Sequence, residues 1–423
     1  MSINLKIKHL KSFVCLVFVV YIQSYGQQYD LLLQKGTVIN PKNGSEEKIL
    51  DIAILNDSIV AIATNIAPSK AKKVINLKGF YVTPGLIDLH SHHFFGTKEN
   101  HYLSEGFEAL PPDGFTFRSG VTTSVDAGSP GWRNFETYKN HVIKHSKTRI
   151  LAFLNIVGEG MRGGIWEQSL SDMDAQMTAL TIQQNPELVG IKVAHYSGAE
   201  WTPIERAVKA GELANVPVMI DFGGHNPPLS LTKLLLEELR PGDIFTHMYA
   251  NLGSVRMTLI NPKTQKLYDY AVKGRERGII FDVGHGGGSF AFAQAIPAIE
   301  EDFYPDTIST DLHTGSMNSG MKDILNVMSK FLNLNMPFSD IIKATTWRPA
   351  QVIHHEELGA LEKGSVADIA VLSIQKGDFG FIDSSGKKMK GNQRIQCEMT
   401  IRAGEIVYDL NGLASMHWNQ KTQ

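Results

Sequence analysis

The middle of this 423-residue chain contains eight short apolar runs separated by longer stretches. The runs are residues 86–90, 122–125, 150–154, 189–193, 218–221, 244–247, 279–283 and 307–311. Intervening stretches such as 203–214 and 231–239 have the amphipathic spacing of a surface helix. Eight strand–helix units over about 250 residues have the dimensions of a TIM (β/α)8 barrel. The sequence therefore predicts an α/β fold with a TIM barrel at its centre.

Both ends of the chain have a different pattern, with short strand-like runs separated by turn-forming residues. Before the barrel the runs are 30–33, 36–39, 51–54 and 58–62, and after it they are 367–372, 398–401 and 405–408. Such alternation predicts strands. We expect a small β-sandwich built from both termini, with residues 27–79 and 351–423 as its two parts and 80–350 as the barrel.

The first 26 residues have the pattern of a secretory signal peptide. Lys6, Lys8 and Lys11 precede an apolar stretch, 13–22, and small residues follow it up to Gly26. The apolar stretch is shorter than the roughly 20 residues that span a bilayer. We expect cleavage near Gly26 and export, most plausibly to the periplasm. An uncleaved membrane anchor is the alternative.

Composition narrows the classes of partner. A formal net charge of -2 provides no basic surface for nucleic acid. No phosphate-binding glycine loop is present. Cys397 is the one cysteine left after cleavage, so no intrachain disulfide can form. We expect a small-molecule substrate, no nucleic acid, no membrane contact in the mature form, and possible homo-oligomers.

Ionisable residues stand at the ends of several predicted strands. His90 and His92 are two positions apart, so a strand presents both imidazoles on one face. Lys192 lies within the fourth strand, and His225, His247 and Asp311 follow the fifth, sixth and eighth. In TIM barrels the carboxyl ends of the strands form the active-site face. We therefore expect these side chains to converge.

Four imidazoles and a carboxylate exceed the ligands that one zinc ion takes. Two ions could share them, with His90 and His92 on one and His225 and His247 on the other. Lys192 would lose its proton readily when buried near dications. Its free amine could then add carbon dioxide, giving a carbamate (N6-carboxylysine) that bridges both ions. Asp311 would bind the first ion and accept a proton, although it could also merely cap a helix.

These residues resemble the amidohydrolase superfamily, in particular its binuclear, carbamylated-lysine branch, which includes dihydroorotases. The matching segments are Asp88-Leu89-His90-Ser91-His92, 190–193, His225, His247, Asp311 and 359–368. Residues 281–290, Phe-Asp-Val-Gly-His-Gly-Gly-Gly-Ser-Phe, are similar to a deacetylase-type subgroup. The resemblance implies two divalent metal ions, by default zinc, and carbon dioxide or bicarbonate for the lysine.

The resemblance implies a metal-dependent hydrolase that removes acyl groups from N-acyl amino acids or O-acyl α-hydroxy acids. A metal-bridging hydroxide would attack the carbonyl, with Asp311 as general base and then general acid. The first alternative is a cyclic amidohydrolase of the dihydroorotase or hydantoinase kind. The second is a non-catalytic metal-binding barrel.

Substrate contacts are harder to assign. A substrate carboxylate needs a cationic or hydrogen-bonding anchor, and Arg162, His285 and Gly286 are candidates by position. His313 shares the face of Asp311, where substrate contact and packing are about equally supported. The glycines 286–288 could also form a simple turn. We expect His93 and His101 not to bind metal, because His93 points away from His90 and His92.

Overall fold

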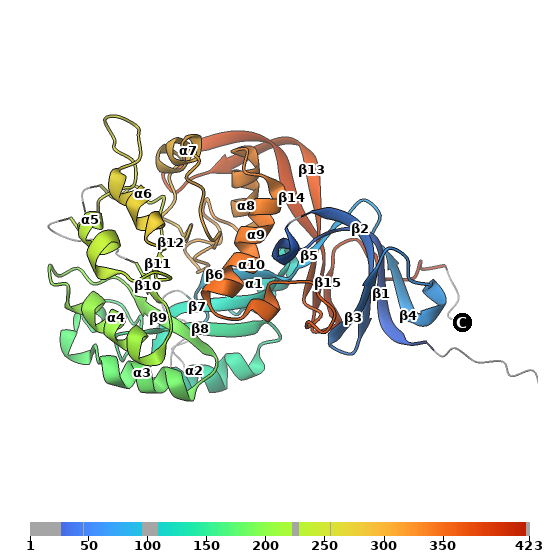
Figure 1. Ribbon diagram of the computed structural model, residues 1–423, viewed down its shortest axis with the longest axis horizontal. Coiled ribbons are helices and arrows are strands. Elements are labelled where there is room, and N and C mark those ends of the chain that lie inside the picture. The colour runs from blue at the N-terminus through green and yellow to red at the C-terminus, as the bar shows by residue number, and fades with distance from the viewer. Residues whose placement is uncertain (1–26, 45, 95–108, 222–227, 254, 420–423) are drawn as a thin grey trace, which may run out of the picture.

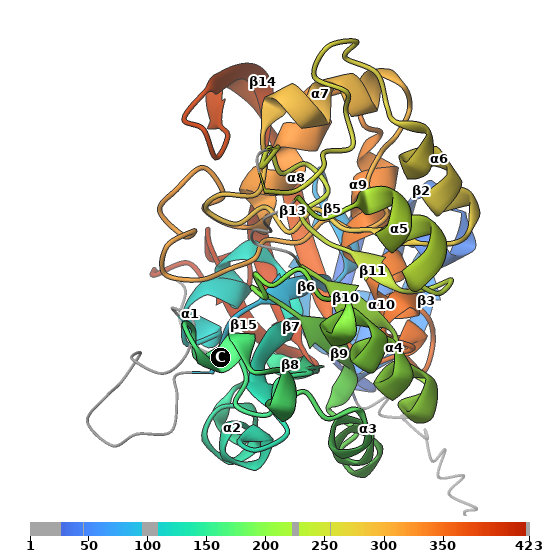
Figure 2. The same ribbon diagram turned by 90° about the vertical axis from the view of Figure 1, so that its left-hand side faces the viewer.

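The computed structural model describes residues 27–419 except 45, 95–108, 222–227 and 254. Its central element is a parallel, curled sheet, visible end-on in Figure 2. In spatial order the strands follow the chain order, β6 to β12. They are β6 (Leu86–Ser91), β7 (Val121–Gly131), β8 (Arg149–Asn155), β9 (Leu188–Val193), β10 (Val218–Ile220), β11 (Ile244–Phe245) and β12 (Ile280–Phe281). The predicted barrel is confirmed, and seven of its strands are regular.

The eighth predicted strand, 307–311, is not a regular strand, which corrects the sequence prediction. The segment still closes the barrel, because isolated bridges join Thr307 to Asp282 on one side and Leu312 to Ser91 on the other. Asp311 interrupts regular pairing, since its φ of 52° is left-handed.

Two buried aspartates hold this closing segment by its hydroxyl groups. Asp282 Oδ1 accepts hydrogen bonds from the hydroxyls of Thr307 and Ser309, at 2.6 Å and 2.9 Å. Asp88 accepts from the Thr310 backbone N–H at 3.0 Å and from its hydroxyl. Side-chain hydrogen bonds thus replace part of the strand ladder beside Asp311.

Helices cover the outside of the barrel (Figure 1). They are α1 (Asp113–Thr116), α2 (Phe135–His141), α3 (Ala175–Gln184), α4 (Thr202–Ala214), α5 (Leu231–Lys233), α6 (Asp269–Glu276), α7 (Phe292–Glu300), α8 (Ile324–Asn333), α9 (Phe338–Thr345) and α10 (Trp347–Val352). α4 matches the helix predicted over 203–214 and ends at Asn215, which has a left-handed backbone. The predicted helix over 231–239 begins as α5 and continues as a π-helical turn, Leu234–Glu238.

Both ends of the chain form a second sheet, at the right of Figure 1. Its order is β15-β14-β13-β5-β1-β2-β3, with β4 also pairing β1. The bounds are β1 (Tyr29–Ile39), β2 (Glu47–Leu55), β3 (Ser58–Ala63), β4 (Ala71–Asn76), β5 (Tyr81–Pro84), β13 (Ile369–Ile382), β14 (Lys388–Arg402) and β15 (Glu405–Asp409). The fold class predicted from the sequence, a barrel with a sheet unit from both termini, is confirmed.

The long strands β13 and β14 leave this sheet and pass over the barrel (Figure 1). At the far end of their hairpin, the Ser384 N–H donates to the Phe290 carbonyl at 2.8 Å. The Phe292 N–H donates to Asp383 Oδ2 at 3.1 Å. The hairpin tip is therefore anchored to the segment that follows β12.

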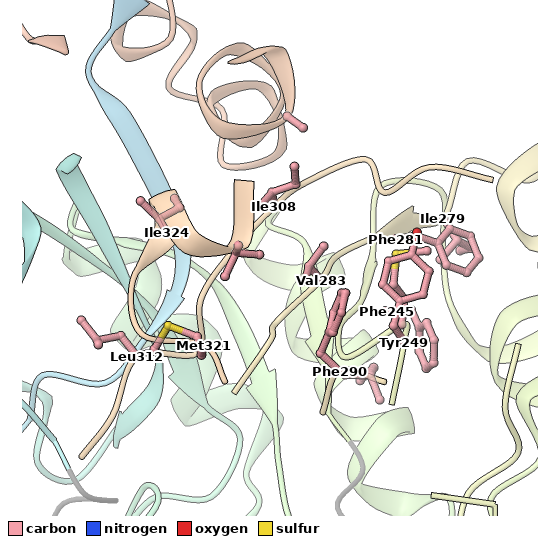
Figure 3. Close-up of a cluster of buried hydrophobic side chains, with 14 of the residues drawn as sticks. Phe245, Tyr249, Ile279, Phe281, Val283, Phe290, Ile308, Leu312, Met321 and Ile324 are labelled. Atoms are coloured by element: carbon pink, nitrogen blue, oxygen red, sulfur yellow. The ribbon is translucent and has the colours of Figure 1, made fainter. Parts of the chain in front are cut away.

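Aromatic side chains fill the space between the last barrel strands and α8 (Figure 3). Phe245 on β11 and Phe281 on β12 pack edge to face, with ring centroids 5.9 Å apart. Phe290 packs in the same way on Tyr249, at 5.7 Å. Phe290, which lies between β12 and α7, also packs edge to face on Phe331 of α8, with ring centroids 6.1 Å apart. This apolar cluster therefore holds the segment between β12 and α7 against α8.

The described part of the chain contains no helix long and apolar enough to cross a membrane. Residues 1–26, the predicted signal peptide, lie outside the described residues. Cleavage and export therefore stay predictions. Cys397 is buried, and burial raises the pKa of its thiol to about 12, as expected for an unreactive cysteine.

Candidate metal centre

The carboxyl ends of the barrel strands bring five of the six predicted metal-binding residues together. His90 lies near the end of β6 and His92 just after it, and Lys192 lies in β9. His247 follows β11, and Asp311 is the last residue of the closing segment. All are buried, with at most 7% of any residue exposed. The sixth, His225, lies outside the described residues. The non-ligand prediction for His101 does too.

The first group contains His90, His92 and Asp311, whose potential ligand atoms lie within 4.8 Å of one another. Asp311 Oδ1 is 3.1 Å from His92 Nε2 and 3.6 Å from His90 Nε2. Period-two spacing along β6 places both imidazoles on one face, as predicted.

The second group contains His90, Asp221 and His247. Asp221 Oδ2 is 3.1 Å from His247 Nε2 and 3.5 Å from Lys192 Nζ. Lys192 Nζ is in turn 2.9 Å from His90 Nε2. His90 is therefore common to both groups, and Lys192 Nζ lies beside both His90 and Asp221.

Sequence reasoning did not assign Asp221, although a signal was present. Asp221 directly follows the apolar strand β10, so it occupies a strand-end position like that of Asp311. The sequence prediction assigned the metal-binding role after this strand to His225 instead. The structure places the Asp221 carboxylate, which is 4% exposed, inside the site.

Hydroxyl groups orient the two β6 imidazoles. His90 Nδ1 is 3.1 Å from Thr246 Oγ1, and Thr246 donates its own proton to Asp282 Oδ2 at 2.7 Å. Thr246 Oγ1 must therefore accept a hydrogen bond from His90 Nδ1–H, which leaves the lone pair on Nε2. His92 Nδ1 is 3.0 Å from Ser129 Oγ. Such outer contacts set the tautomer and direction of metal-binding histidines.

Thr246→Val removes this support for His90 with little change of shape. We expect the affinity for divalent metal to fall about 10- to 100-fold, because the ring loses its fixed tautomer. Competition with a chromophoric chelator measures the effect. Thr178→Val is the matched control, since the buried Thr178 hydroxyl on α3 has no hydrogen-bond partner among the residues that the structure describes. Equal affinities in both variants would contradict the role of Thr246.

The electrostatics of the site favour metal-binding forms of its side chains. Burial lowers the pKa of His90 well below its ordinary value and also lowers the pKa of His92. Neutral imidazoles result, each with a lone pair. Burial alone would raise the pKa of Asp311, but His90 and His92 outweigh it and hold that pKa well below its ordinary value. His247 and Lys192 do the same for Asp221.

The backbone is strained where these ligands lie. His247 and Asp311 have φ values of 57° and 52°, in the left-handed region that L-residues rarely adopt. Gly286 also has a left-handed backbone, with φ of 52°, and a Cβ on it would lie 2.3 Å from Asp311 Oδ2. Both facts favour glycine at this position. Strain of this kind typically persists at functional sites, where surrounding structure holds it.

A pocket of about 250 Å³ opens above the two groups. His92, Asp221, His247 and Asp311 line it together with Gly287 and Gly288. His313, a predicted substrate contact, also lines it, and its Nε2 is 3.9 Å from Asp311 Oδ2. The pocket therefore joins both candidate metal groups to open space for a substrate.

The other predicted substrate contacts lie elsewhere. His285 is fully buried and stacks on Phe290, and its Nδ1 donates to the Gly286 carbonyl at 2.9 Å. Arg162 pairs with Glu159 at 2.8 Å and lies over the Trp166 ring. Neither of the two side chains, nor Gly286, is among the described residues that line the pocket. His93 is buried on the opposite face of β6, bonded to Leu110 and Ser124.

Sequence reasoning also missed a buried acid–histidine pair at the pocket. Glu167 is 1% exposed, and its Oε2 accepts a hydrogen bond from His195 Nδ1 at 2.8 Å. His195 lines the pocket two residues after β9 ends. The position of His195 just beyond the end of a barrel strand was the sequence feature that could have indicated it.

A barrel that gathers two overlapping His/Asp groups at its active-site face defines a metal-binding barrel enzyme. The donor set fits divalent metal ions, because neutral imidazole nitrogens and ionised carboxylates are the ligands that zinc-like ions take. Exclusion from solvent, fixed tautomers and a pocket above the ligands agree with that class.

Comparison with known proteins gives the family. The sequence profile of the amidohydrolase family matches residues 291–407. A deacetylase of Brucella anthropi is 34% identical over 368 residues, 84% of this chain and 87% of the relative. The crystal structure of an adenine deaminase has a TM-score of 0.79 and 30% identity, covering 90% of this chain and 100% of that chain. That of a dihydroorotase has a TM-score of 0.76 and 29% identity, covering 90% and 99%.

The chain belongs to the amidohydrolase superfamily. The resemblance seen in the strand-end motifs is thereby confirmed, and divalent metal ions are the cofactors that the family and the donor set support. The protein is a hydrolase, and the predicted enzyme class, hydrolysis of carbon–nitrogen bonds other than peptide bonds, is confirmed at that level.

Proposed function

We propose that this protein is a metal-dependent deacylase that hydrolyses an acyl amide or ester, with Asp311 as the proton-transferring group. The observation that carries the proposal is the position of Asp311. Its carboxylate lies 3.1 Å from His92 Nε2 and also lines the pocket, so it faces both the candidate metal group and the substrate space. The full-length similarity to a deacetylase supports acyl-group removal.

His90, His92 and Asp311 would hold one metal ion, and Asp221, His247 and Lys192 lie where they would hold another, with His225 as a further predicted ligand. Bound divalent ions, by default zinc, supply a Lewis acid and lower the pKa of water to about 7. The Nε2 lone pair of His90, fixed by Thr246, and the carboxylates of Asp311 and Asp221 are what the chain itself contributes to binding.

Asp311 moves the proton in this proposal. In the proposal its carboxylate, which lies beside His92 and lines the pocket, accepts a proton from the attacking water. The same carboxyl group then returns the proton to the departing amine or alcohol. The backbone N–H groups of Gly287 and Gly288, which also line the pocket, are proposed donors to the developing charge.

Lys192 is proposed to be carbamylated. The lysine is fully buried at the end of the apolar strand β9, with Nζ 2.9 Å from His90 Nε2 and 3.5 Å from Asp221 Oδ2. A carbamate, formed when the neutral amine adds carbon dioxide and releases a proton, would place an anion between the two groups. Bicarbonate should therefore increase metal loading of the wild type and should not increase it in Lys192→Met, as measured by metal analysis of the purified proteins.

A second function, opening of a cyclic amide, is favoured by the similarity to the dihydroorotase structure. It would use the same metal groups and the same proton transfer at Asp311. Open-chain and cyclic substrates differ in the product, since ring opening releases no separate acid. Product analysis therefore separates the two functions.

The test is hydrolysis of a panel of N-acyl D- and L-amino acids, O-acyl α-hydroxy acids and cyclic amides by the metal-loaded protein with bicarbonate. We expect cleavage of an open-chain substrate that bears a carboxylate. Activity on rings alone would move the protein to the second function. A protein that holds its metal and cleaves no member of the panel would contradict both.

We also propose export to the periplasm, which detection of a mature chain beginning near residue 27 would test.

A further inference from the structure

We propose that His195, held by Glu167, binds the anionic group of the substrate and so sets the preference for carboxylate-bearing substrates. This inference rests on the proposed deacylase function and deepens it, because it assigns the substrate class to a particular side chain. The pair lies outside both candidate metal groups.

The described pocket wall leaves few groups that could bind an anion. Among the described residues that line the pocket, none is a lysine or an arginine. Two histidines line it without belonging to a candidate metal group, His195 and His313. A substrate carboxylate needs a hydrogen-bond donor, and preferably a cation, at this wall.

His313 is the weaker candidate of the two. Its Nδ1 accepts a hydrogen bond from the Gly315 backbone N–H at 3.1 Å, so that nitrogen is already engaged by the main chain. Its Nε2 is 3.9 Å from Asp311 Oδ2. His313 therefore lies beside the proton-transferring carboxylate.

His195 has the opposite hydrogen bonding. Its Nδ1 donates to Glu167 Oε2 at 2.8 Å, because a carboxylate can only accept. The Glu167 side chain is 2% exposed, and its other oxygen accepts from the Gly163 N–H at 2.8 Å. A buried carboxylate in this position stabilises the imidazolium, and the pKa of His195 is raised although burial lowers it. With Nδ1 donating to Glu167, protonation of the ring adds a second donor at Nε2, on a residue that lines the pocket.

The backbone around the pair holds His195 at the pocket. The Gln168 side-chain amide donates to the His195 carbonyl at 2.8 Å, and Gln168 Oε1 accepts from the Ser197 N–H at 2.9 Å. His195 itself has a left-handed backbone, with φ of 52°. One short 3-10 helix, Trp166–Gln168, thus fixes both the ring and the main chain of His195.

The experiment compares an N-acyl amino acid with its uncharged carboxamide on wild type, His195→Gln and Glu167→Gln. We expect the wild type to prefer the carboxylate. His195→Gln should raise the KM for the carboxylate substrate about 10- to 100-fold, the range for a lost hydrogen bond to a charged group, and leave the KM for the carboxamide unchanged. Glu167→Gln, a change in a positioning residue, should shift KM in the same direction by less, with a smaller effect on kcat.

His355→Gln is the matched control. His355 Nδ1 is 2.8 Å from Glu357 Oε1, the same separation as in the pocket pair, and its side chain is 32% exposed against 31% for His195. The control should leave both KM values unchanged. Metal content should stay at the wild-type value in all variants.

Several outcomes would overturn the proposal. They are a wild type without preference for the carboxylate, equal losses on both substrates, an unchanged preference in His195→Gln, and loss of metal from that variant. If the wild type hydrolyses no member of the panel, the deacylase function fails. Calorimetric binding of the same two compounds to metal-loaded Asp311→Asn then still tests His195, because that comparison requires no turnover.

Discussion

Asp311→Asn should lower kcat by about 10²- to 10⁴-fold, the range for loss of a positioned proton-transfer group. The amide keeps the size of the side chain and tolerates its left-handed backbone, so the fold should persist. The measurement is steady-state kinetics on the best substrate of the panel, with metal content determined on the same samples.

Asp302→Asn is the matched control for this substitution. Asp302 is exposed and also has a left-handed backbone, with φ of 58°, but it lies outside the pocket. It should keep the wild-type kcat. The assignment of Asp311 is wrong if Asp311→Asn retains metal and turns over at the wild-type rate. A loss of metal together with activity would show that Asp311 acts chiefly as a ligand.

Lys330→Met should lower the free energy of unfolding by about 1–3 kcal/mol, the range for leaving a buried hydrogen-bonding group unpaired. Lys330 on α8 is fully buried. Its ammonium donates to His285 Nε2 and, at 2.8 Å each, to the carbonyls of Gly320 and Ile382. Methionine fills a similar volume and leaves all three acceptors unpaired.

Thermal unfolding measures the effect, and we expect the midpoint to fall by about 5–10 °C. Lys343→Met on α9, an exposed lysine in a helix, is the control and should change it little. A midpoint equal to that of the control would contradict the stabilising role of the three hydrogen bonds that Lys330 donates.

The same lysine predicts a pH dependence. Burial lowers the pKa of Lys330 to about 7 in the folded protein, whereas an unfolded lysine titrates near 10.4. Between these values the unfolded chain binds more protons, so the contribution of Lys330 to stability rises with pH above about 7. The stability gap between wild type and Lys330→Met should therefore be wider at about pH 9 than at about pH 6. A gap that narrows would contradict this assignment.

The barrel and most of its candidate metal centre could be predicted because local patterns determine them. Alternation along β6 places His90 and His92 on one face whatever the rest of the chain does. A lysine in the apolar strand β9 is costly to bury without partners, so Lys192 stood out for the same local reason. Parallel strands then bring such residues to a common edge.

Other features depend on contacts between segments far apart in the chain. His285 follows β12 like a substrate contact, but its ring stacks on Phe290 and meets Lys330, 45 residues later. Asp221 and the Glu167–His195 pair enter the site through the packing of neighbouring loops. No periodic pattern in the sequence indicates these contacts.

The sequence by itself determined the strand and helix periods, the apolar core and the strand-end histidines, because these follow from which face each residue occupies. Only the tertiary structure decided which side chains touch. It joined Asp221 to His247 and Lys192, directed His285 away from the pocket, and closed the barrel with a segment held by Asp88 and Asp282. The physical reason is that hydrogen bonds between buried polar groups form wherever packing brings them within about 3 Å, at any separation in sequence.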